Sequence, residues 1–387
     1  MYPALEGLRE IAKSGEYRRI PVCRELYSDR YTPVEVMRTL RTASRHCYLL
    51  ESASQTEVWG RYSFLGYEPS MEITCTDGNL QIRKIHEDGT EEITKQQVKH
   101  PGDAIRKILK EYKSPVLEKM PTFTGGLVGY FSYDYIKYSE PKLELTDKTV
   151  EDFRDMDLML FDQVIAFDHY RQKVLLITGV MTDDLENSFG KAEKKLQEMA
   201  DLIRKGEQKE FPSLKLQSSI EPQFPKEKYC EMVETARHYI REGDIFQVVL
   251  SNPMRARAEG SLFDTYRVLR ATNPSPYMFY FSSDDIEIAG ASPETLARLA
   301  GTELSTFPLA GTRPRGKTKE EDLALEKGLL ADEKERAEHN MLVDLGRNDI
   351  GKISKIGTVN VEKYMCIERF SHVMHIGSTV PGQIRDD

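Results

Sequence analysis

Two glutamates one helical turn apart, Glu335 and Glu338, could hold a divalent cation. They lie in residues 332–353, DEKERAEHNMLVDLGRNDIGKI, whose pattern predicts a helix, and His339 directly follows the second glutamate. Mg²⁺ binds one or two carboxylates together with water and substrate oxygens, so this pair is a candidate metal site. The spacing alone favours the alternative of a charged, solvated helix face, because residues three positions apart share one surface.

A third glutamate, Glu294, follows a strand-like run. The segment IEIAGASPETLARL predicts a strand, a glycine turn and then a helix, with Ser292 as its N-cap and Pro293 as its first residue. The helix dipole favours an acidic residue in a first turn, which is a purely structural explanation. Loops at such junctions also place reactive groups, so a site role for Glu294 stays open.

A Gly-Thr pair precedes a basic stretch in FPLAGTRPRGKTKEED. The backbone N–H groups of Gly311 and Thr312 could hold a carboxylate. The basic residues that follow are Arg313, Arg315, Lys317 and Lys319. The stretch is not a P-loop, because GxxxxGK[ST] does not match, and a solvated basic loop explains these residues equally well.

Other polar residues interrupt apolar runs that predict strands. Gln247 lies in the run from Ile245 to Leu250, where a buried amide must be hydrogen-bonded to avoid a cost of roughly 1–3 kcal/mol. In RFSHVMHIGSTV, His372 and His375 would point to opposite faces of a strand, which argues against joint metal binding. One of these histidines could be a catalytic base, and packing in the core is the alternative for both.

The elements that must position these residues are mostly strands in the first half of the chain. Predicted strands are CYLLES, SMEITCT, NLQIRKI, GGLVGYF and KVLLITGV, and predicted helices are residues 187–206, which stop at Gly206, and residues 228–243. Polar, proline-bearing residues 207–225 are the best domain boundary. In the helix over 332–353, we expect Met341, Leu342 and Leu345 to face inward.

Composition excludes several classes of protein. The 387 residues are 39% hydrophobic and 30% charged, as in globular proteins, and no apolar run is long enough for a membrane span. The net charge of −9 argues against a nucleic-acid partner and requires local cations at any anion site. The five cysteines show neither zinc spacing nor a disulfide framework, and no secretory signal is present, so we expect a cytoplasmic location.

Nine blocks in order resemble the chorismate-binding enzymes, and most closely the anthranilate synthase component I group. The blocks are LLES (49–52), GRYSFLG (60–66), GGLVGYFSYD (125–134), REGDIFQVV (241–249), NPSPYMFY (273–280), GASPE (290–294), PLAGTRPRG (308–316), AEHNMLVDLGRND (337–349) and HVMH (372–375). Each block alone suits a structural role, whereas their shared order does not arise by chance. The resemblance implies an α+β fold of large, mostly antiparallel sheets flanked by helices.

The resemblance also implies an Mg²⁺-dependent conversion of chorismate and ammonia to anthranilate and pyruvate, the first step of tryptophan biosynthesis. Gly311 and Thr312 would hold substrate, and Glu338 would ligate the Mg²⁺. Glu294 would act as general acid on the departing C4 hydroxyl, and His375 would serve the elimination step. The metal would supply the positive charge that the acidic chain lacks.

Two positions separate the subgroups of this family. The resemblance assigns Gln247 to substrate binding. Relatives that add water to chorismate carry a lysine base at this position. Ala310 stands where aminodeoxychorismate synthases tend to carry a nucleophilic lysine. Both favour anthranilate formation. The alternatives are aminodeoxychorismate synthase component I and a non-catalytic fragment that binds tryptophan.

The same family carries a tryptophan feedback site, which the resemblance assigns to two of the blocks. Glu51 would pair with the ammonium group of L-tryptophan, and Ser52 would hydrogen-bond to the ligand. The remaining residues of this site would be Pro276, Tyr277 and Met278, which wall the indole, and Arg61.

Two domains follow from the resemblance: residues 1–218, with part of the tryptophan site, and residues 219–387, the chorismate-binding catalytic region. Family members continue beyond VPGQIRDD with further substrate and metal residues, so we expect an incomplete catalytic region and little turnover. No cysteine lies in a GxCxG-type elbow, so ammonia would come from a separate glutamine amidotransferase subunit.

Overall fold

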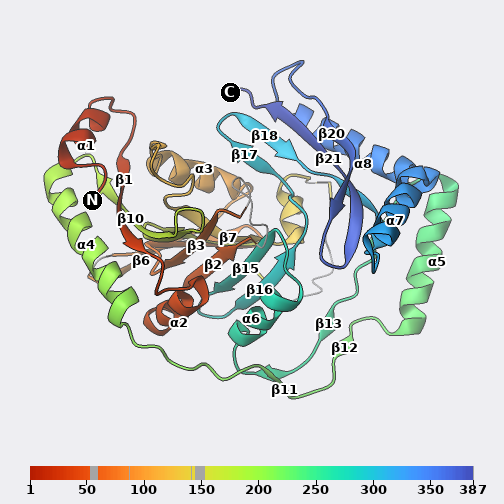
Figure 1. Cartoon of the computed structure of the whole chain (residues 1–387), viewed down its shortest axis with the longest axis horizontal. Helices are drawn as coiled ribbons and strands as arrows, with labels where there is room; N and C mark the ends of the chain where they lie inside the picture. Colours follow the sequence, from red (N-terminus) through yellow and green to blue (C-terminus); the bar gives the residue numbers. More distant parts are fainter. Residues whose placement is uncertain (53–59, 87, 141, 144–152, 387) are drawn as a thin grey trace. The chain divides into compact units, whose positions relative to one another are not determined.

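The computed structural model describes residues 1–52, 60–86, 88–140, 142–143 and 153–386. The chain divides into two compact units, the first comprising Met1–Lys209 with Val268–Asp387 and the second Glu210–Arg267. Figure 1 shows the chain coloured from the N-terminus to the C-terminus. Among the described residues, no helix has the length and apolarity that a bilayer crossing requires.

The main sheet of the first unit has seven strands in the order β1-β10-β9-β3-β2-β15-β16, with all neighbours antiparallel. Its strands are β1 (Arg19–Tyr27), β2 (Cys47–Glu51), β3 (Tyr62–Tyr67), β9 (Val164–Asp168), β10 (Lys173–Met181), β15 (Tyr277–Ser282) and β16 (Glu287–Ser292). Strands on both sides of the predicted 218/219 boundary therefore complete one sheet.

A second sheet of the first unit has five strands in the order β6-β5-β4-β8-β7. Its strands are β4 (Met71–Thr76), β5 (Asn79–Ile85), β6 (Glu91–Gln97), β7 (Gly126–Phe131) and β8 (Met156–Phe161). Ile108 of helix α3 (Gly102–Glu111) packs in its core, and a short 3₁₀ helix, η1, covers Tyr133–Tyr138. Gly129 permits the close approach of β7 to β8, since a Cβ there would lie 2.0 Å from the Asp157 carbonyl oxygen.

Three further helices belong to the N-terminal part of this unit: α1 (Leu5–Ala12), α2 (Pro33–Ala43) and α4 (Leu185–Lys205). The predicted helix over 187–206 is confirmed as α4, which packs on β10 and α1 through a face that includes Leu196 and Met199 (Figure 1). It ends at Gly206, as predicted. Thr32 caps α2 by accepting a hydrogen bond from the Glu35 N–H.

Ion pairs join the second sheet to the β15–β16 turn. Arg154 pairs with Asp157 at 2.6 Å and with Asp285 of the turn at 2.9 Å, and Arg83 pairs with Glu72 at 2.8 Å and with Asp284 of the turn at 3.2 Å. Asp157 is 0% exposed, and one of its carboxylate oxygens has no hydrogen-bond partner among the described residues. Burial raises the pKa of Asp157 to about 6, although Arg154 opposes the shift.

The C-terminal sheet runs β17-β18-β21-β19, with β20 also paired to β21. Its strands are β17 (Arg298–Ala300), β18 (Glu303–Thr306), β19 (Leu309–Pro314), β20 (Glu362–Arg369) and β21 (Val373–Gln383), and the helices packed on it are α7 (Lys319–Ala331) and α8 (Glu333–Gly351) (Figure 1). The helix predicted over 332–353 is confirmed as α8.

The inward face of α8 differs from the prediction. Leu345 is 52% exposed, and the buried side chains are His339, Val343 and Ile350. Val343 and Ile350 pack with Val380 of β21. The prediction is wrong for Leu345, which lies two positions beyond Val343 on a different side of the helix, whereas Met341 and Leu342 are half-buried.

The second unit holds helix α5 (Lys226–Glu242) and two small antiparallel pairs. The pairs are β11 (Lys215–Leu216) with β14 (Ala258–Glu259) and β12 (Glu221–Pro222) with β13 (Met254–Arg255). Helix α6 (Phe263–Thr272) runs across the boundary of the two units. As predicted, α5 ends at Gly243, whose φ of +84° is left-handed.

The strand predicted after α5 is wrong. Residues 245–250 form no strand pairing with the described part of the chain, and Phe246 and Val249 are 86% and 87% exposed. An apolar run becomes a strand only where another strand satisfies its backbone groups, and sequence pattern does not report the partner.

Candidate active site

Strands β19 and β21 bring three predicted site residues together. Their register shifts between Ala310 and Thr312, and Gly311 takes a left-handed φ of +71° at the shift. Thr312 pairs with His375 across the ladder. The Nδ1 atom of His375 lies 3.0 Å from the Gly311 carbonyl oxygen and 3.1 Å from the Thr312 hydroxyl oxygen.

This contact determines which nitrogen of His375 carries the proton in the neutral ring. A carbonyl oxygen only accepts hydrogen bonds, so Nδ1 is the donor to Gly311. The lone pair of the neutral imidazole is therefore on Nε2. Such an imidazole can accept a proton from a substrate carbon.

An acidic side chain of α8 lies against the same turn. A Cβ at Gly311 would be 3.1 Å from a carboxylate oxygen of Glu335, which shows how closely the acid approaches the backbone. Asp332 caps α8 by accepting from the N–H groups of Lys334 and Glu335. Arg313 contacts both acids, at 2.9 Å to Asp332 and 3.5 Å to Glu335, and supplies a local cation.

Glu338 lies one turn further along α8 and is half-buried. His339 is buried between α8 and the sheet, where its Nε2 lies 2.7 Å from the Ser378 hydroxyl, and burial lowers its pKa. His339 is therefore a core residue. Across the described residues, no three acidic, histidine or cysteine side chains form a metal-holding group. Glu335 and Glu338 lie one turn apart on α8 and are both half-buried, and Mg²⁺ commonly takes one or two carboxylates with water and substrate oxygens, so the metal site there remains a prediction.

The predicted helix around Glu294 is wrong. Strand β16 ends at Ser292 as expected, but residues 293–297 are irregular and lead into β17. Arg298 pairs with Ser305, and the Thr306 hydroxyl donates to the Leu296 carbonyl at 3.0 Å, so pairing with β18 replaces the helix. Glu294 is exposed, and its N–H donates to the Ser292 hydroxyl at 3.3 Å.

Gln247 belongs to the second unit, in the unpaired segment 245–250. Its side chain is exposed, so the expectation of a buried amide is wrong. The role of Gln247 in substrate binding remains a prediction.

The residues assigned to a ligand site meet on neighbouring strands of the main sheet. Glu51 of β2 pairs with Met278 of β15, and both are buried. Pro276 and Tyr277, just before Met278, are half-buried, and Ser52 follows Glu51 directly.

The charged residues of that ligand site already have protein partners. Arg270 of α6 makes two hydrogen bonds to the Glu51 carboxylate, at 2.8 and 3.0 Å. Arg61 pairs in the same two-bond manner with Asp168 and stacks near Tyr62. These bonds to Asp168 raise the pKa of Arg61. The Arg270 partner was missed because a lone arginine at a helix end gives no sequence signal.

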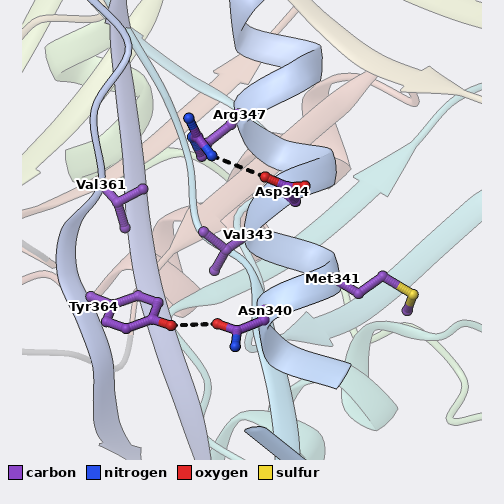
Figure 2. Close-up of a pocket in the computed structure, with 7 residues that line it drawn as sticks. All are labelled: Asn340, Met341, Val343, Asp344, Arg347, Val361 and Tyr364. Carbon is purple, nitrogen blue, oxygen red and sulfur yellow. Dashed lines mark hydrogen bonds and ion pairs between the residues drawn. The ribbon is translucent and has the colours of Figure 1, made fainter. Parts of the chain in front are cut away.

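A cavity of about 430 Å³ lies beside α8. Figure 2 shows its lining residues, which are Asn340, Met341, Val343, Asp344, Arg347, Val361 and Tyr364. Its polar groups pair with one another: Arg347 with Asp344 at 3.0 Å, and the Tyr364 hydroxyl with the Asn340 amide oxygen. None of the predicted site residues lines it.

Comparison with known proteins confirms the expected fold and family. Anthranilate synthase component 1 of Acinetobacter calcoaceticus is 42% identical over 98% of this chain and 77% of that protein, and the Aquifex aeolicus protein of the same name is 40% identical over 99% and 77%. The crystal structure of anthranilate synthase component I from Streptococcus pneumoniae superposes with a TM-score of 0.72 at 36% identity, covering 87% of this chain and 72% of that one. Residues 45–387 match the chorismate binding enzymes. The chain therefore belongs to the chorismate-binding enzyme family.

Proposed function

We propose that this chain is the large subunit of an anthranilate synthase and converts chorismate and ammonia to anthranilate and pyruvate. The observation that carries the proposal is the arrangement of His375, Gly311 and Thr312, in which Nδ1 donates to the Gly311 carbonyl and Nε2 is left as the base. Relatives of this name at about 40% identity over nearly the whole chain support it.

The residues divide the reaction between them. The turn at Gly311 and Thr312 holds the substrate, and Glu294 protonates the C4 hydroxyl as it leaves, because hydroxide is a poor leaving group. Ammonia bonds to C2. His375 then takes the C2 proton while pyruvate leaves, which makes the ring aromatic.

Glu338 and Glu335 would hold Mg²⁺, and the bound ion would supply positive charge for the anionic substrate. The approach of Glu335 to the Gly311 turn supports this assignment, because it places carboxylate oxygens beside the substrate-binding backbone. Arg313 lies 3.5 Å from Glu335 and offsets part of its negative charge.

Ammonia would come from a separate glutamine amidotransferase subunit, and L-tryptophan would inhibit through the site at Glu51. The Glu51–Arg270 pair would compete with tryptophan binding, because the ammonium group of tryptophan must displace the Arg270 guanidinium from the Glu51 carboxylate. All five cysteines are free thiols, which supports the cytoplasm as the location.

The test is anthranilate fluorescence from the purified chain with chorismate, Mg²⁺ and excess ammonium at alkaline pH. We expect a slow rise in signal, in keeping with the little turnover predicted from the sequence, which EDTA abolishes and which glutamine does not support in place of ammonium. Absence of anthranilate together with absence of chorismate binding would refute the proposal. Calorimetric titration with tryptophan distinguishes the proposed enzyme from the alternative of a non-catalytic chain, which would bind tryptophan and form no anthranilate.

A further inference from the structure

The hydroxyl of Tyr277 ties the segment that carries Glu294 to the main sheet. Tyr277 is the first residue of β15, and its hydroxyl oxygen lies 2.5 Å from that of Thr295, the residue after Glu294. Both side chains are half-buried. Backbone pairing of β15 with β16 ends at Tyr277 and Ser292, so this contact extends the hairpin beyond its last backbone pair.

The other end of the segment is held by β18. The Thr306 hydroxyl donates to the Leu296 carbonyl at 3.0 Å, and Arg298 then pairs with Ser305. Residues 293–297 are thus held by side-chain hydrogen bonds from Tyr277 and Ser292 of the main sheet and from Thr306 of the C-terminal sheet. Glu294 lies between Ser292 and Thr295, directly before the Tyr277 contact, on a backbone that is neither helix nor strand.

We propose that Tyr277 is a positioning residue for Glu294, acting through Thr295. The inference rests on the proposed function, in which Glu294 protonates the leaving hydroxyl. A proton donor must lie within hydrogen-bond reach of its acceptor, so the reaction slows when the segment that carries the donor loses one of its anchors. The preceding assignments make Tyr277 a wall of the tryptophan site, so one side chain serves both sites.

Hydrogen exchange of the full chain tests the contact without requiring turnover. β16 is the edge strand of the main sheet, so those amides among Gly290, Ala291 and Ser292 that bond to β15 report opening of the hairpin end. Loss of the hydrogen bond in Tyr277→Phe or Thr295→Val should speed their exchange about fivefold, which corresponds to ~1 kcal/mol. The double variant should exchange no faster than either single variant, because both remove the same bond, and Thr295→Ser should remain near the wild-type rate.

The matched control is Tyr364→Phe, which removes a tyrosine hydroxyl that bonds to Asn340 away from the site. It should leave exchange at residues 290–292 unchanged. Unchanged exchange in Tyr277→Phe would overturn the inference. Additive effects in the double variant would also overturn it, because they would show two independent contacts.

Steady-state anthranilate formation with ammonium tests the catalytic part. Tyr277→Phe and Thr295→Val should each lower kcat about fivefold and change KM for chorismate less than twofold, with Thr295→Ser restoring kcat. A loss confined to KM would contradict a positioning role. Absence of both anthranilate formation and chorismate binding in the wild-type chain would refute the proposed function and this catalytic role together, while the exchange result would still decide whether the contact holds the segment.

Discussion

Substitution of Gly311 by alanine should destabilise the chain in two separable ways. The left-handed φ of +71° costs an L-residue ~1–2 kcal/mol. The added methyl would also lie 3.1 Å from Glu335, 3.2 Å from Leu329 and 3.3 Å from Ile376. Leu329 and Ile376 are both fully buried and cannot move aside, so crowding adds roughly 1–3 kcal/mol. We therefore expect a total loss of roughly 2–5 kcal/mol in the free energy of unfolding.

A second glycine provides a control for the backbone part alone. Gly301, in the turn between β17 and β18, has φ +63° and open space where a methyl would be added. Gly301→Ala should lose only ~1–2 kcal/mol. The assay is urea denaturation of both variants, with the midpoints compared at equal slope. Equal losses in the two variants would refute the crowding argument.

The same substitution should impair the candidate site. The Gly311 carbonyl accepts from Nδ1 of His375, so a shifted turn would disturb the base as well as the substrate-binding N–H groups. Anthranilate formation by Gly311→Ala should fall more than tenfold, measured well below the denaturation midpoint, whereas Gly301→Ala should keep its rate. Full activity in Gly311→Ala would contradict the placement of this turn in the site.

Three other predictions concern charge and catalysis. Burial raises the pKa of Asp157 to about 6, because the folded chain disfavours the charged carboxylate. The stability that the protonated group contributes is therefore complete below its ordinary pKa and is lost as the pH rises through about 6. Asp157→Asn should therefore stabilise the chain at pH 8, by up to about 3 kcal/mol, and have little effect at pH 4, as measured by urea denaturation; a larger gain at pH 4 would contradict the sign. Glu51→Gln should weaken tryptophan binding at least tenfold by calorimetry, whereas Arg270→Gln should strengthen it by removing the competing cation, and equal weakening in both would argue against competition. His375→Gln should lower anthranilate formation by about 10²–10⁴ with the fold unchanged by circular dichroism, and a full rate would exclude it as the base.

Local sequence patterns predicted helices and strands well where the residues of the element itself determine its structure. The alternation in Met71–Thr76 and Asn79–Ile85 and the helical face of α4 each follow from their own residues. The failures lie where a distant segment decides. Residues 294–299 have helical propensity, but pairing of Arg298 with Ser305 prevails, and the run at 245–250 finds no strand partner among the described residues.

The candidate site was less accessible from spacing alone. Thr312 and His375 are 63 positions apart, and only the ladder of β19 with β21 brings them together. Their joint assignment came from the order of motifs that the family shares. Arg270 and Glu335 show the limit of that approach, since their contacts with Glu51 and the Gly311 turn depend on how helices pack on sheets.

The pairing of β2 with β15 also bears on how the chain folds during synthesis. Glu51 is synthesised 219 positions before its partner Arg270, which corresponds to roughly 10–45 s of translation at the usual elongation rate. During that interval one edge of β2 has no partner strand, and exposed edges invite pairing with other chains. The main sheet is therefore completed late, by the same hairpin that carries Tyr277 toward Glu294. A chaperone that covers β2 should therefore raise the soluble yield of this chain more than that of a protein whose strands pair in sequence, and slow translation should lower it.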